Sequence, residues 1–207
     1  MSGVACRATT ADVSADRRRR LLLGRLWATI ALAAFAPAAP AAAQVVVDEA
    51  AAALERSVKA AFVFKFAGFV DWPAEALPPD APIRIGVMGE ETIVQEITEA
   101  ASSRTVEGRR VLAKRIEPGD TLEGVHILFM RDPAFRKLAS AVADLKPEAM
   151  LIVTESPGAL ERGSIVNFAV DDGRVRFDLS IEAAEQRGLK LSSRLITVAR
   201  HAVGRAR

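Results

Sequence analysis

The chain has 207 residues, half of them hydrophobic, and its 28 basic and 26 acidic side chains give a net charge of +2. The first 43 residues hold six Arg and two Asp, so the rest of the chain carries 22 basic and 24 acidic side chains and is slightly negative. This nearly neutral mixture gives no reason to expect nucleic acid as a partner.

Cysteine and histidine are scarce. The single cysteine, Cys6, lies in the N-terminal stretch, so residues 44–207 contain no thiol for a disulfide, a nucleophile or a metal ligand. The two histidines, His126 and His201, are not accompanied by carboxylates at ligand spacing. We therefore expect no catalytic cysteine, no metal ion and no other cofactor.

The N-terminus has the layout of an export signal. Four arginines, 17–20, precede the apolar run 21–36, and three alanines, 41–43, then offer a cleavage point before Gln44. We expect residues 1–43 to be a cleaved signal peptide and residues 44–207 to form a single domain. An uncleaved N-terminal anchor is the alternative, and the choice between general and twin-arginine export stays open.

Hydrophobic periodicity predicts the order of the elements in residues 44–207. An Ala-rich, aromatic helix is expected first, followed by a Pro-rich loop, and after it strands alternate with helices. The predicted helices are residues 49–70, 91–101, 132–145, 181–187 and a last helix, capped by Ser192, that includes Val203. The predicted strands before the hairpin are residues 83–88, 109–116, 125–130 and 150–155.

Residues 164–180 predict a β-hairpin. Asp172 and Gly173 form the two-residue loop typical of a type I′ turn, in which both residues need a positive φ. The predicted fold is α/β: a sandwich with a central mixed, partly parallel sheet flanked by helices. An aromatic-rich helix stands at its N-terminus, and the C-terminal antiparallel hairpin is expected at the sheet edge.

The first helix raises a question of charge burial. Phe62, Phe66 and Phe69 share one stripe at helical spacing, which predicts a core helix packed on the sheet. Lys59 falls inside that stripe, so its ammonium group must reach solvent along its own stem or meet a carboxylate. We expect Lys59 and Asp178, on the second strand of the hairpin, as a candidate buried ion pair.

Several segments in a fixed order resemble one protein family. They are the helix KAAFVFKFAGFVDWP, the strand IRIGVMG, and GVHILFM, MLIVTE, GSIVNF, RVRFDLS and GLKLSSRLITVA. Together they resemble the YfiR family, also labelled DUF4154, over roughly residues 55–203. One departure concerns Val125, where many relatives carry Cys, so any redox-gated switching attributed to the family cannot operate in a chain without that thiol.

The resemblance implies regulation instead of catalysis. YfiR-like proteins are periplasmic partners of inner-membrane signalling proteins, typically a diguanylate cyclase whose periplasmic sensor domain they bind and hold inactive. For this chain, the periplasmic domain of a diguanylate cyclase or of a sensor kinase is the expected partner. The resemblance thus implies a non-enzymatic periplasmic regulator of cyclic-di-GMP signalling and biofilm formation, for which a homodimer stays open. The alternative is an exported small-ligand sensor or α/β enzyme with a pocket at the C-terminal ends of the strands, near Gly89, Met130 and Glu155.

Two further sets of residues are site candidates. Exposed aromatic and apolar residues anchor interfaces, which suggests Trp72, Pro73, Leu77 and Phe69 for partner binding; a core position for Trp72 is equally open. The opening of the last helix and a strand-to-helix turn suggest Ser193, Arg194 and Gly89 for anion or ligand binding.

Overall fold

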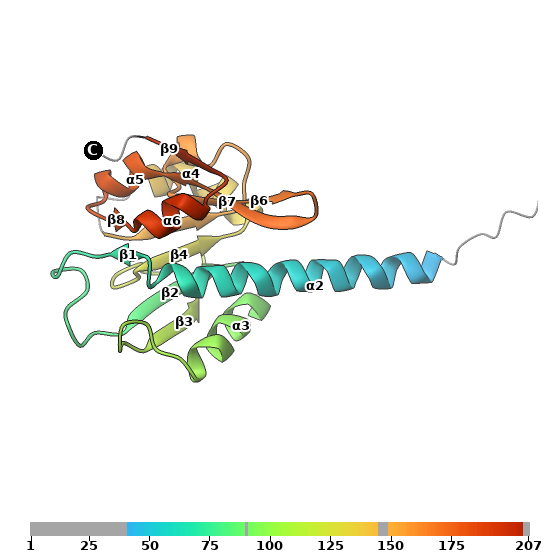
Figure 1. Ribbon diagram of the computed structural model, residues 1–207, viewed down its shortest axis with the longest axis horizontal. Helices are drawn as coiled ribbons and strands as arrows, with labels where there is room; N and C mark the ends of the chain where they lie inside the picture. The colour runs from blue at the N-terminus through green and yellow to red at the C-terminus, as the bar shows by residue number, and fades with distance from the viewer. Residues whose placement is uncertain (1–40, 90, 145–148, 205–207) are drawn as a thin grey trace, which may run out of the picture. The chain divides into compact units, whose positions relative to one another are not determined.

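The computed structural model describes residues 41–204, except residue 90 and residues 145–148 (Figure 1). The chain divides into two units, Met1–Val47 and Asp48–Arg207, and the fold described below is that of the second. The predicted signal peptide, residues 1–43, lies almost wholly outside the described residues. No helix within the described ranges is long and apolar enough to cross a bilayer.

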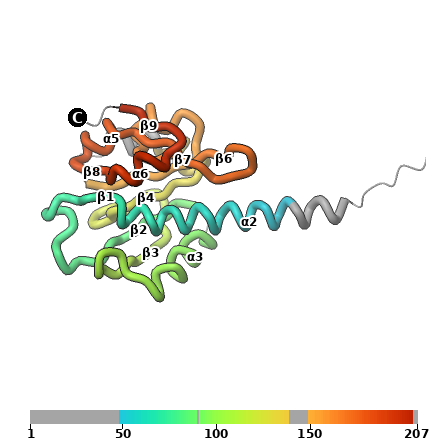
Figure 2. The backbone as a smooth tube through the Cα atoms, in the orientation of Figure 1, coloured from blue at the N-terminus to red at the C-terminus, as the bar shows by residue number. Residues whose placement is uncertain are grey.

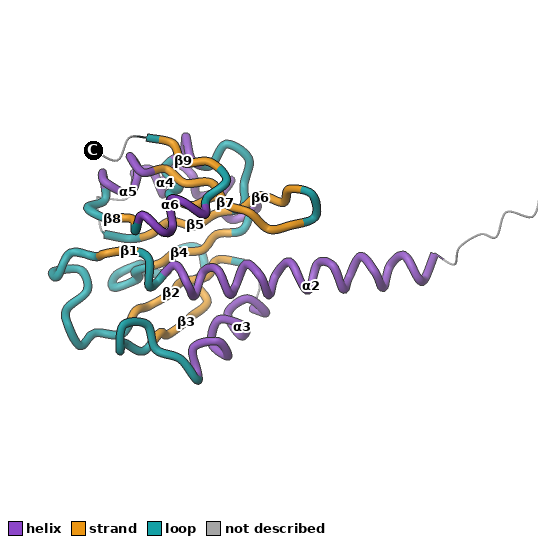
Figure 3. Tube along the Cα trace, viewed as in Figure 1, coloured by secondary structure: helices purple, strands orange, loops and turns teal. Residues whose placement is uncertain are grey.

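Helices and strands alternate through most of the second unit, as the periodicity predicts (Figure 3). The helical elements are α2 Ala41–Phe66, α3 Glu91–Ser102, α4 Asp132–Asp144, η1 Leu160–Arg162, α5 Ile181–Gln186 and α6 Ser193–Val198. The strands are β1 Val70–Asp71, β2 Ile83–Met88, β3 Val111–Arg115, β4 Ile127–Met130, β5 Leu151–Thr154, β6 Val166–Asp171, β7 Arg174–Ser180, β8 Lys190–Leu191 and β9 His201–Val203.

Seven strands form one mixed sheet in the order β3-β2-β4-β5-β6-β7-β9. All neighbours are parallel except β6 and β7, which form the predicted antiparallel hairpin. Asp172 and Gly173 have φ of 48° and 69°, as a type I′ turn requires. The predicted α/β sandwich with a partly parallel sheet is confirmed.

Alternate residues of the central strands serve two cores, one on each face of the sheet. In β4, Ile127 and Phe129 belong to the core under α2 and α3, whereas Leu128 and Met130 belong to the core that contains Phe135 of α4. All four β4 side chains are fully buried. A strand covered on both faces reads as an unbroken apolar run, which explains the sequence ILFM.

The aromatic helix packs on the hairpin, as its stripe predicts. The Phe66 ring lies 5.2 Å from the Phe177 ring, edge to face, and 5.9 Å from the Phe168 ring, between centroids. Phe62 contacts the same two hairpin rings, at 5.6 and 6.1 Å. Because these strands follow the helix by about a hundred residues, the cluster joins distant parts of the chain (Figure 2).

The first helix ends earlier than predicted, at Phe66 and not at residue 70. Its last turn tightens into hydrogen bonds between residues three apart, including Phe69 N–H to Phe66 O at 3.0 Å. Val70 then pairs with Leu191 in a two-stranded antiparallel sheet, β1 with β8. This tertiary pairing, which the local sequence does not specify, turns the chain away from the helix axis.

The last helix is also shorter than predicted, because α6 ends at Val198 and Ala199 is extended. Arg200 N–H donates to Phe177 O at 2.9 Å, and Val203, predicted as helical, lies in β9 beside β7. The hairpin is therefore not at the sheet edge: β9 covers it. The predicted N-cap is confirmed, since the Ser192 side chain accepts a hydrogen bond from Arg194 N–H.

Candidate functional site

A cluster of paired charges, two of them buried, lies where the parallel strands end. Lys59 Nζ on α2 is 2.6 Å from Glu155 Oε2, and Arg131 Nε is 2.7 Å from Glu155 Oε1. The side chains of Lys59 and Glu155 are each 9% exposed. Lys59 also pairs with Glu55 one helical turn earlier. Glu155 therefore forms ion pairs with both Lys59 and Arg131, and it connects α2 to the carboxyl ends of β4 and β5.

The predicted pairing of Lys59 with Asp178 is wrong. Lys59 is buried and meets carboxylates, but they belong to Glu155 and Glu55. Asp178 instead accepts two hydrogen bonds from the Arg200 guanidinium, and its Oδ1 also lies 3.1 Å from His201 Nδ1. The hydrogen bond from Arg200 holds the pKa of Asp178 below its usual value, and His201 lowers that pKa further.

A cleft of about 540 Å³ opens beside this cluster. Its lining comes from α2, from the segments that follow β4 and β5, from β6 and β7, and from the residue before β9. The lining residues are Glu55, Lys59, Arg131, Glu155, Ser156, Pro157, Gly158, Asn167, Phe168, Ala169, Val170, Asp178 and Arg200. An open cleft with converging polar groups therefore lies at the strand ends, where the alternative hypothesis places a pocket.

Asn167 is an uncharged polar residue of the cleft whose side-chain oxygen is held by two hydrogen bonds. Its Oδ1 accepts hydrogen bonds from Thr154 Oγ1 at 2.8 Å and from Ser156 N–H at 3.0 Å. Thr154 lies directly opposite Asn167 in the register of β5 and β6. These two hydrogen bonds to the oxygen fix the plane of the side-chain amide. The amide nitrogen lies on the opposite side of the group from the oxygen.

The three predicted anion-binding residues are not brought into one cavity. Gly89 lines a cavity of about 260 Å³ with Arg115, Arg131 and Lys137, and neither Ser193 nor Arg194 lines it. Ser193 and Arg194 are exposed at the start of α6. Gly89 has a φ of 144°, a backbone conformation that residues with a side chain rarely adopt, so this turn favours glycine.

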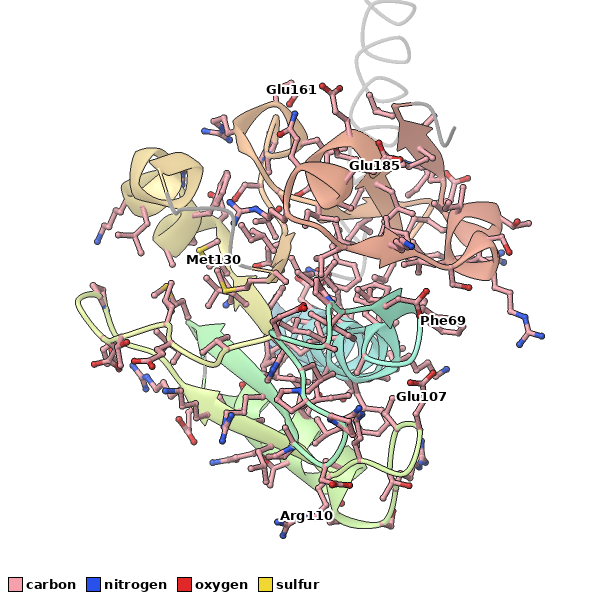
Figure 4. All side chains as sticks on the ribbon, turned by 90° about the vertical axis from the view of Figure 1, so that its left-hand side faces the viewer. Phe69, Glu107, Arg110, Met130, Glu161 and Glu185 are labelled. Carbon is pink, nitrogen blue, oxygen red and sulfur yellow. The ribbon has the colours of Figure 1, made fainter. Side chains whose placement is uncertain are left out.

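The four residues predicted for partner binding differ in exposure. Leu77 is 8% exposed and belongs to the core, so it offers a partner almost no surface. Trp72, Pro73 and Phe69 are half-buried, and Phe69 lies beside α2 (Figure 4). Trp72 Nε1 is buried with no hydrogen-bond partner among the described residues. Only part of each of these three side chains is available to another protein.

His126 secures the loop that follows Trp72. Its Nδ1 accepts from Arg84 N–H at 3.0 Å, and its Nε2 lies 3.1 Å from Ala76 O. The Trp72 ring stands edge-on to the imidazole at 6.3 Å. Burial lowers the pKa of His126 below its usual 6.5, with Arg84 and Arg109 acting in the same direction. His126 is thus a neutral structural histidine whose Nε2–H donates to the loop.

Sequence reasoning missed Glu155, Arg131 and Asn167 as members of one cluster, although a signal was present. Arg131 directly follows β4, and Glu155 directly follows β5. Neighbouring parallel strands end at the same edge, so residues that follow them meet. The packing of α2 across that edge, which brings Lys59 there, has no local signal.

Within the described ranges, no group of three or more His, Cys, Asp or Glu side chains could hold a metal ion. The cluster of Lys59, Arg131 and Glu155 is composed of paired charges, an arrangement suited to fixing elements and binding polar groups. His126 uses both ring nitrogens in structural hydrogen bonds.

Comparison with known proteins identifies one family. The model of DUF4154, described as YfiR/HmsC-like, matches residues 56–200. A search of curated proteins gives no match. The matched range runs from α2 to the residue before β9, so it contains Lys59, Glu155 and Asn167 together with the whole hairpin.

Proposed function

Because this chain belongs to the DUF4154 family of YfiR/HmsC-like proteins, we propose that it is a periplasmic repressor of a diguanylate cyclase in the inner membrane. Membership makes it, in general terms, a periplasmic regulator of cyclic-di-GMP signalling, and the family is regulatory and not catalytic. The family match over residues 56–200 is the observation that carries the proposal.

The N-terminal sequence supports export. The arginine-rich start, the apolar run 21–36 and the alanines before Gln44 would direct residues 44–207 across the inner membrane. A repressor on that side can reach only the periplasmic part of a membrane protein. Its target would therefore be a cyclase, or a sensor kinase, whose periplasmic sensor domain controls a cytoplasmic output.

The surface around Trp72 is the contact region we propose for the target. Trp72 and Phe69 are half-buried aromatics on either side of β1, and Pro73 borders a cleft of about 620 Å³. Large amphipathic side chains that are partly exposed on a fixed backbone lose little entropy on binding and anchor many interfaces.

A pull-down from inner membranes tests the proposal. Residues 44–207 carrying a C-terminal tag serve as bait, and mass spectrometry identifies the retained proteins. We expect a protein that joins a periplasmic domain to a diguanylate cyclase domain, and we expect the Trp72→Ala bait to retain less of it. Leu112→Ala, which truncates an exposed apolar residue on β3, is the matched control. Folded bait that retains no cyclase and no sensor kinase would contradict the proposal.

One observation favours a second role in ligand sensing. The cleft beside Lys59 and Glu155 is open and polar, whereas a filled strand end would have argued against a pocket. A regulator can also bind a small molecule, so this role is compatible with the first.

A further inference from the structure

The cleft at the strand ends presents one hydrogen-bond donor that the protein has fixed in place and not used. The Asn167 oxygen is held by Thr154 and Ser156. Its nitrogen has no hydrogen-bond partner among the described residues, and Asn167 lines the cleft. A donor oriented in advance binds a ligand oxygen at a low entropic cost.

The charges of the cleft, in contrast, are already matched. Three cations and three carboxylates line it: Lys59, Arg131, Arg200, Glu55, Glu155 and Asp178. Each cation has a carboxylate partner at 2.5 to 2.7 Å. An anionic ligand would meet three carboxylates and a cationic ligand three cations. Binding either would compete with existing pairs and leave a buried charge without its partner.

A neutral ligand leaves these pairs intact. Hydroxyl groups can accept from the Asn167 amide and donate to the unused lone pairs of the Glu155 and Asp178 oxygens. The volume of about 540 Å³ lies within the usual range of small-molecule sites. We propose that this cleft binds a neutral, hydroxyl-rich small molecule, a sugar or polyol of one or two rings.

Such a ligand would lie against the attachment of α2. Lys59 and Glu55 both lie on that helix, and the bond from Lys59 to Glu155 fastens it to the sheet. Occupancy of the cleft would therefore bias the position of α2, and this shift would couple ligand binding to the regulatory activity. This regulatory consequence rests on the proposed function, whereas the binding itself does not.

Nuclear magnetic resonance of residues 44–207 tests the binding directly. Glucose, N-acetylglucosamine and maltose are the neutral probes, and inorganic phosphate, glutamate and putrescine are the charged comparators. A site with a Kd of about 1 mM is about nine-tenths filled at about 10 mM free ligand. We expect at least one neutral probe to give saturable shifts of the Asn167 side-chain NH₂ signals and of the amides of residues 155–158, and the charged probes to give none.

Two variants sharpen the test. Asn167→Asp keeps the oxygen that accepts from Thr154 and Ser156 but removes the amide donor, and it should weaken sugar binding about tenfold or more. Lys137→Ala, in the neighbouring cavity beside Gly89, should leave the affinity unchanged. If Asn167→Asp does not fold, the location of the shifts in the unmodified protein decides.

Three results would overturn the proposal: no saturable shift from any neutral probe, shifts that centre away from Asn167, or equal affinity of the Asn167→Asp variant. Preferential binding of a charged comparator in the cleft would overturn the neutral ligand class. The titration contains no membrane protein. Its failure would thus leave the cyclase proposal standing, and failure of the pull-down would leave the ligand site standing.

Discussion

Lys59 on α2 donates to Glu155 across 96 residues of chain, at 2.6 Å, with both side chains nine-tenths buried. Removing one partner of a buried ion pair leaves an uncompensated charge, which is far more costly than losing the pair's attraction alone. The bond therefore fixes the position of the aromatic helix more than it adds stability.

Lys59→Met should lower the free energy of unfolding by about 3 kcal/mol, because Glu155 is left buried with only the partly exposed Arg131. Urea denaturation measures the change. The double variant Lys59→Met with Glu155→Leu should be less destabilised than the sum of the single variants, since neither charge then remains. Arg115→Met breaks the exposed pair with Glu117 and should cost less than about 1 kcal/mol. Equal effects of Lys59→Met and Arg115→Met would contradict the buried role.

The burial of His126 makes the stability of the fold depend on pH. The pKa of His126 is lowered in the folded chain, so below pH 6.5 the unfolded chain binds a proton that the folded chain does not. The free energy of unfolding should fall as the pH drops from 6.5 toward the folded pKa. Thermal midpoints recorded between about pH 7.5 and 5 measure this slope. His126→Gln should flatten it, and an unchanged slope in that variant would refute the assignment to His126.

Asp178 on β7 holds the edge strand β9 through its bonds to Arg200 and His201. Its pKa is lowered chiefly by the hydrogen bond from Arg200, so its contribution to stability is complete above pH 3.8 and disappears as the pH falls through the folded pKa. Asp178→Ala should accelerate amide hydrogen exchange in β9 at neutral pH, with little change in β4. The matched variant Asp171→Ala, at the hairpin tip, should leave β9 protected. Unchanged exchange in β9 would show that the strand pairing alone holds it.

Phe66 is a member of the aromatic cluster, with one ring neighbour on its own helix and two on the hairpin. Its side chain is 1% exposed. Phe66→Ala should cost about 3 to 5 kcal/mol, a large fraction of the stability of a domain of this size. Phe66→Leu should cost less because more of the cavity stays filled. A cost below about 1 kcal/mol for the alanine variant would mean that the helix is not docked on the hairpin.

Local patterns predicted most of the sheet. The apolar run at residues 83–88 gives β2 with the predicted bounds. The Asp172-Gly173 turn specifies the hairpin, because the turn needs a positive φ at two successive residues and few residue types tolerate one. The short strands β1, β8 and β9 were not predicted. Their two or three residues carry no periodicity, and they are strands only because distant segments pair with them.

The site was less predictable than the fold. A carboxylate partner for Lys59 follows from its place in an apolar stripe, but several carboxylates could meet it, and Asp178 was the wrong choice. To identify Glu155 as the partner of Lys59, one must know that α2 lies over the strand ends. Asn167 has an ordinary sequence setting on β6, and its fixed amide depends on its register with Thr154 across two parallel strands.

The most direct test of the proposed repression is to delete the gene in its native organism and measure cellular cyclic-di-GMP. Deletion should raise the level, and the full chain should restore it. A form without residues 1–43 should fail to restore it, because it would stay in the cytoplasm, apart from the periplasmic domain of its target. An unchanged level after deletion, or full restoration by the form without the leader, would contradict a periplasmic repressor of a diguanylate cyclase.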